Sequence, residues 1–195
     1  MLRLVAPASV RDGQATNGDE GIGGMDTYMV VLRIVHILAG VFWVGAALTT
    51  FLFLQPTARE VGPAAGPFMA HLAGKKKLVD WVLRAAGLTV LAGVLMYWRD
   101  SGGLDPDWIT SAQGLALTVG ALCAITAFTL GLTIVKPTLM ATLALGREVA
   151  ASGGTPTPEQ AAKLQALGKR GKDVGQIIVP LLIVAVAAMA SARYL

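Results

Sequence analysis

Four runs of about 20 apolar residues are the strongest constraint on this chain, because a helix of that length crosses the hydrocarbon core of a bilayer. The runs cover residues 28–54, 78–98, 114–135 and 174–194. The third, GLALTVGALCAITAFTLGLTIV, has no charged residue, whereas a helix of a soluble protein carries a polar stripe. The sequence therefore predicts an all-α fold, a bundle of four transmembrane helices whose partner is the lipid bilayer.

Composition agrees with a membrane domain. Of the 195 residues, 54% are hydrophobic and 14% are charged, where soluble domains carry about 25% charged residues. We expect one domain over residues 27–195, preceded by a polar, glycine-rich segment 1–26 that is disordered. Translation starts at Met1 or at Met25, which directly precedes the first run.

The segments between the runs differ in charge. Segments 56–77 and 136–173 hold most of the 16 Lys and Arg residues, whereas the loop 99–113 is acidic. By the positive-inside rule these two basic segments lie in the cytoplasm, so both termini lie outside a cell membrane that the chain crosses several times. The net charge of +4 follows this topology, and we therefore expect no nucleic-acid partner.

Several short patterns describe the bundle in more detail. AALTTFLFLQPT and AFTLGLTIVKPT end the first and third runs, which predicts two parallel helical-hairpin repeats. Small residues four apart, as in 85, 89 and 93 or 116, 120 and 124, predict close helix contacts.

Thr157 and Gln160 form a capping box that predicts a helix leading into the fourth run. Asp80 and Arg84 have the spacing of an ion pair within one helix.

One titratable residue lies inside the first run. In VLRIVHILAGVFWVG, residues 31–45, the side chains of Arg33, His36, Gly40 and Trp43 share one helix face. An imidazole in hydrocarbon needs a partner or a ligand. In one interpretation His36 ligates a metal, the iron of a b-type haem. Arg33 would then bind a propionate, Trp43 would pack on the macrocycle and Gly40 would leave room for it. In the other interpretation His36 forms a hydrogen bond with a neighbouring helix, and the side chain of Arg33 reaches to the membrane surface.

The pattern of His36, Trp43, Gly45 and Pro56, followed by the second run KKKLVDWVLRAAGLTVLAGVLMYW, resembles a superfamily of small bacterial inner-membrane proteins. The superfamily includes CopD-type copper-resistance domains and HemJ-type protoporphyrinogen oxidases. The resemblance implies a four-helix unit linked to redox or metal chemistry. It also implies that the first-helix histidine, His36 here, is a haem ligand.

Three functions remain open from the sequence. The chain is a b-type haem protein for membrane electron transfer or haem handling, a copper transport or resistance protein, or a structural or accessory subunit without a cofactor. It contains no nucleophile elbow, phosphate loop, HExxH motif or carboxylate pair within a run, so we do not expect an enzyme. The other histidine, His71, belongs to the cytoplasmic side, so a second axial ligand would come from a methionine or from a homodimer or larger complex.

Overall fold

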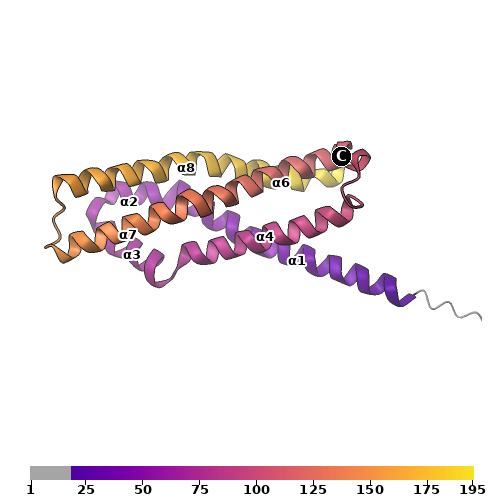
Figure 1. Ribbon diagram of the computed structural model, residues 1–195, viewed down its shortest axis with the longest axis horizontal. Coiled ribbons are helices and arrows are strands. Elements are labelled where there is room, and N and C mark those ends of the chain that lie inside the picture. The colour runs from indigo at the N-terminus through magenta and orange to yellow at the C-terminus, as the bar shows by residue number, and fades with distance from the viewer. Residues whose placement is uncertain (1–18) are drawn as a thin grey trace, which may run out of the picture.

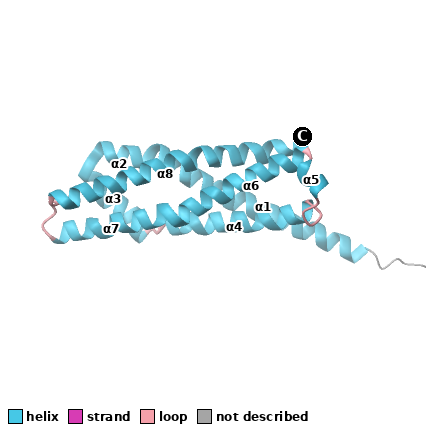
Figure 2. Ribbon diagram, turned by 45° about the horizontal axis from the view of Figure 1, so that its top comes forward, coloured by secondary structure: helices cyan, strands magenta, loops and turns pink. Residues whose placement is uncertain are grey.

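The computed structural model describes residues 19–195, and the regular structure in this part of the chain is helical throughout (Figure 2). The α-helices are α1 Asp19–Thr49, α2 Gln55–Val61, α3 Gly66–Ala70, α4 Leu78–Asp100, α5 Pro106–Thr110, α6 Ala112–Leu130, α7 Lys136–Ala151 and α8 Pro158–Ser191. The described residues also form three π-helical turns, Thr50–Leu54, His71–Lys75 and Gly131–Val135, and two 3-10 turns, Gly62–Ala65 and Ala192–Tyr194. Of the segment 1–26 expected to be disordered, residues 1–18 lie outside the described residues, and α1 already begins at Asp19.

Four long helices form a bundle, which confirms the predicted fold class (Figure 1). The spans are Thr27–Val61, Leu78–Asp100, Ala112–Ala151 and Pro158–Tyr194. Three of them extend well beyond the apolar runs at the end that carries the basic residues. Hydropathy marks only where charged side chains begin, and these side chains do not interrupt a helical backbone.

The start of α8 shows how the sequence defines one of these extensions. The backbone N–H of Gln160 donates to Oγ1 of Thr157, and the backbone N–H of Thr157 donates to Oε1 of Gln160. Pro158 occupies the first helical position, where its missing N–H costs nothing. The predicted capping box is confirmed, and α8 runs from it without a break to Ser191.

The bundle exposes most of its apolar surface. In the most apolar window of each span, only 11% to 28% of the residues are buried. On α1 the side chains of Leu38 and Val41 are 66% and 68% exposed. An apolar surface of this size is unfavourable in water and suits hydrocarbon, so the chain is an integral membrane protein that crosses the bilayer several times.

The four helices pair as two hairpins, α1 with α4 and α6 with α8 (Figure 1). Small residues line both contacts. A Cβ atom built on Gly40 of α1 would lie 3.4 Å from Cγ2 of Thr89 in α4. A Cβ atom on Gly120 of α6 would lie 3.2 Å from the carbonyl oxygen of Ala185 in α8. The close helix contacts predicted from the small residues are confirmed.

The two hairpins carry the same local distortion at the same place. The π turns Thr50–Leu54 and Gly131–Val135 close with hydrogen bonds from the N–H groups of Gln55 and Lys136, and the next residues are Pro56 and Pro137. Proline has no N–H and its ring crowds the carbonyl four residues earlier. The wider π turn lets each helix pass the proline without a break, so the sequence repeat is also a structural repeat.

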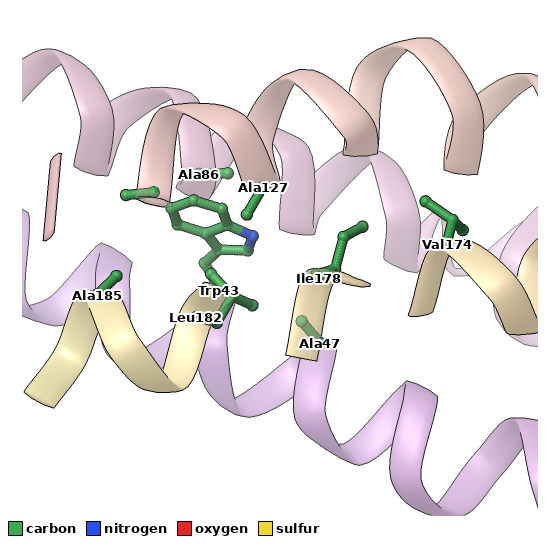
Figure 3. Close-up of a cluster of buried hydrophobic side chains, with 9 residues drawn as sticks. Trp43, Ala47, Ala86, Ala127, Val174, Ile178, Leu182 and Ala185 are labelled. Atoms are coloured by element: carbon green, nitrogen blue, oxygen red, sulfur yellow. The ribbon is translucent and has the colours of Figure 1, made fainter. Parts of the chain in front are cut away.

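Side chains from all four long helices meet in one central core (Figure 3). Trp43 of α1 is 5% exposed and meets Phe128 of α6 edge to face, with the ring centroids 6.4 Å apart. Around the indole lie small and aliphatic residues of the other helices: Ala86 of α4, Ala127 of α6, and Ile178, Leu182 and Ala185 of α8. Trp43 is thus the largest side chain in the buried core.

The two ends of the bundle differ in charge. The start of α1 and the C-terminus lie at one end, with the acidic loop between α4 and α6, and we call this the acidic end (Figure 1). The turn between α7 and α8 lies at the opposite, basic end. There Asp80 does not pair with Arg84, as the spacing predicted, but with Nζ of Lys136 at 3.1 Å. Arg84 instead lies over the ring of Trp81, at 5.2 Å from its centroid.

Candidate functional site

His36 lies on the side of α1 that packs against α4, in the half of the bundle nearer the acidic end. Its ring nitrogen Nδ1 is 2.8 Å from the backbone carbonyl oxygen of Thr89. Because a carbonyl oxygen only accepts hydrogen bonds, Nδ1 carries the hydrogen and donates it. The imidazole therefore joins the two helices of the first hairpin by a hydrogen bond inside the apolar span.

A glycine in α4 makes this approach possible. A Cβ atom built on Gly93 would lie 2.9 Å from Cε1 and 3.1 Å from Nδ1 of His36. A contact of 2.9 Å is shorter than Cβ atoms in proteins essentially ever make, so a side chain at this position would collide with the imidazole. Since Thr89 and Gly93 are four residues apart, they lie on the same face of α4, one accepting the hydrogen bond and the other clearing the space.

Thr89 is the second polar residue of this contact. It is buried, and its hydroxyl group donates to the carbonyl oxygen of Ala85 at 2.8 Å. Its methyl group fills the space beside Gly40, so Gly40 contributes a close helix contact and not an open cavity next to the histidine. Within this contact the backbone carbonyl of Thr89 is the atom that meets the imidazole.

The hydrogen bond selects one tautomer of the neutral ring. With hydrogen on Nδ1, Nε2 of the neutral ring holds a lone pair and acts as an acceptor. Within residues 27–195 no hydrogen bond to Nε2 is formed. Histidine ligands of metals generally donate their other N–H to a carbonyl or carboxylate in this way, because the bond fixes the tautomer and the ring orientation.

The four residues that the sequence places on one face of α1 have different surroundings in the structure. Arg33 is exposed about one turn from His36, and it forms no ion pair with any described residue. Trp43 is buried in the core against Phe128, away from the surface. His36 and Gly40 contact α4, and of these four residues Arg33 and the Nε2 atom of His36 have no hydrogen-bond or ion-pair partner in the described part of the chain.

Two candidate second ligands lie elsewhere in the described part of the chain. His71 lies at the basic end, beside Lys75, at the other end of the molecule. Met189 of α8 packs against α6, where a Cβ atom on Gly120 would lie 3.0 Å from its Cγ. Over the described part of the chain no three His, Cys, Asp or Glu side chains gather as a metal site.

The sequence points to His36 but not to its partner. In the sequence, Thr89 and Gly93 are predicted only as small residues that let helices approach each other. The signal was present in the spacing, since His36 and Gly40 in α1 and Thr89 and Gly93 in α4 each form a pair four residues apart. The register between the two helices, which decides that Gly93 faces His36 and Thr89 faces Gly40, cannot be read from either helix alone.

Comparisons with protein families, with curated proteins and with solved structures give no match to this chain. The site is therefore interpreted from its own geometry.

Proposed function

We propose that this membrane protein binds b-type haem through Nε2 of His36, for electron transfer within the membrane or for haem handling. The observation that carries the proposal is the hydrogen bond from Nδ1 of His36 to the carbonyl oxygen of Thr89. It holds the imidazole in the tautomer whose Nε2 lone pair can ligate iron. The resemblance of the first two helices to CopD-type and HemJ-type proteins points to the same histidine.

The residues around His36 fit such a group at the surface of the bundle and not inside it. The core is filled by Trp43 and its neighbours, and Thr89 fills the space beside Gly40. Arg33 is exposed and has no carboxylate partner among the described residues, so its guanidinium is available for a propionate. Trp43 and Gly40 contribute by holding α1 in place.

Bound haem would supply a one-electron redox centre. The chain itself contributes the orientation of the ligand. The carbonyl of Thr89 accepts a hydrogen bond from Nδ1. This bond raises the basicity of Nε2, which makes Nε2 a stronger ligand for a metal. The absence of a side chain at Gly93 lets the ring lie close to α4. We further propose that the acidic end, with both termini, faces the outside, which places His36 in the outer half of the bilayer.

The absorption spectrum of the purified protein tests this proposal. After haem is added to the protein in detergent and unbound haem is removed by gel filtration, we expect a Soret band that His36→Ala removes. His71→Ala is the matched control and should leave the band unchanged, because His71 lies at the other end of the molecule. A folded wild-type protein that stays colourless, or a His36→Ala variant that keeps the band, would refute haem ligation by His36.

The same contact between His36 and Thr89 also favours a second function, that of a structural or accessory subunit without a cofactor. The polar groups of His36 Nδ1 and Thr89 satisfy each other, and Gly40 and Gly93 are both used by helix packing. Under this alternative the histidine only joins α1 to α4. Colourless folded protein that co-purifies with a partner would support it.

A further inference from the structure

An open cavity of about 410 Å³ lies at the basic end, between the segment that leads into α4 and the extension of the third span. It is lined by Pro67, Ala70, His71, Gly74, Lys75 and Arg147. The first five belong to α3 and the π turn that follows it, whereas Arg147 belongs to α7. The two walls are more than 50 residues apart in the sequence. The cavity therefore exists only because the fold brings them together.

Local backbone features build the wall formed by α3 and its π turn. The chain reverses after α2 at Gly62, whose φ of 71° favours glycine. Pro67 then occupies the first turn of α3, and the π turn His71–Lys75 continues the helix until Lys77, with φ of 52°, starts α4 in a new direction. The opposite wall exists because α7 continues far beyond the apolar run that ends at Val135.

The charges of the lining residues are of one sign. Lys75 and Arg147 are cationic, His71 adds a ring N–H donor, and no carboxylate lines the cavity. Asp80 with Lys136 is the one ion pair that the described residues form, so neither Lys75 nor Arg147 forms an ion pair with a described side chain. A second cavity at this end, of about 350 Å³, contains Lys169 and Arg170 but also the carboxylate of Asp173.

We propose that the cavity of His71, Lys75 and Arg147 binds a phosphate group. A planar guanidinium forms bidentate hydrogen bonds with phosphate, and an ammonium group and a ring N–H add further donors. Basic cavities on the cytoplasmic side of membrane helices hold the headgroups of anionic lipids. The phosphate therefore comes either from an anionic phospholipid of the inner leaflet or from a soluble phosphate compound, and this proposal does not depend on haem binding.

The test uses the full chain in a neutral detergent with phosphatidylcholine, and the unfolding temperature is measured as ligand is added. One arm adds phosphatidylglycerol, and the other adds inorganic phosphate at constant ionic strength. The site variant Lys75→Gln with Arg147→Gln is compared with the control Lys169→Gln with Arg170→Gln, which removes the same charge from the second cavity. Arg147→Gln alone serves if the double variant does not fold.

We expect wild type and control to be stabilised alike, and the site variant to bind at least about tenfold more weakly, the effect of losing roughly 1.4 kcal/mol of charge-assisted hydrogen bonding. Stabilisation by phosphatidylglycerol alone identifies a lipid headgroup as the ligand. Stabilisation by both additions identifies a phosphate group from either source. Absence of stabilisation in both arms, or equal weakening in site variant and control, overturns the proposal.

Discussion

Asp80 of α4 forms an ion pair with Lys136 of α7, with Oδ1 and Nζ 3.1 Å apart. The pair connects the first hairpin to the second at the point where both helices leave the apolar part of the bundle. Lys136 is also the residue whose N–H closes the π turn ahead of Pro137. The distorted turn and the contact between hairpins therefore occur at the same residue.

A double-mutant cycle should show coupling between Asp80 and Lys136. Their side chains are 29% and 44% exposed, so we expect a coupling energy of only about 0.5 kcal/mol for Asp80→Asn with Lys136→Gln. The same cycle with Arg84→Gln should give a value near zero, because Arg84 lies over Trp81. The free energy of unfolding in mixed micelles is the measurement, and a larger coupling to Arg84 than to Lys136 would contradict the structure.

Gly93→Ala should destabilise the protein by about 1–3 kcal/mol, because the new methyl group would overlap the ring of His36. Gly87→Ala in the same helix is the matched control. Its Cβ atom would make an ordinary contact of 3.6 Å with Phe128, so the better helix propensity of alanine should leave stability equal or slightly higher. The unfolding temperatures of the two variants test this prediction. Equal unfolding temperatures would mean that the ring of His36 does not lie against Gly93.

Trp43→Ala should lower the free energy of unfolding by about 3 kcal/mol, because it leaves a cavity among tightly packed side chains of the core. Trp98 of α4 provides the comparison. Its side chain is 58% exposed near the end of the span, so Trp98→Ala should cost less than about 1 kcal/mol. Similar losses for the two variants would mean that the indole of Trp43 is not a core residue.

Cysteine labelling should establish the orientation of the bundle. In a Cys123→Ala background, Thr155→Cys lies in the exposed turn between α7 and α8, and Asp107→Cys lies in the acidic loop. From the positive-inside rule we expect a membrane-impermeant reagent to label Asp107→Cys on intact cells and Thr155→Cys only after permeabilisation. The opposite pattern would place both termini in the cytoplasm.

The features that the sequence predicted correctly are those with a local cause. Apolar runs located the four spans, and the spacing of Thr157 and Gln160 identified the start of α8. The features that it missed depend on the register between helices. Asp80 has two basic residues within reach, and its choice of Lys136 over Arg84 depends on how α4 lies against α7. The same holds for His36, whose contact with Thr89 and Gly93 follows from the packing of α1 on α4.

The proposed haem ligation by Nε2 of His36, with Nδ1 donating to Thr89, has a direct spectroscopic signature. Hyperfine spectroscopy of the haem-loaded protein, with its histidines labelled with the nitrogen-15 isotope, detects it. We predict coupling of the ferric electron spin to a labelled histidine nitrogen in wild type and in His71→Ala, and no such coupling in His36→Ala. Haem that is bound without this coupling, or a folded wild-type protein that takes up no haem, would contradict it.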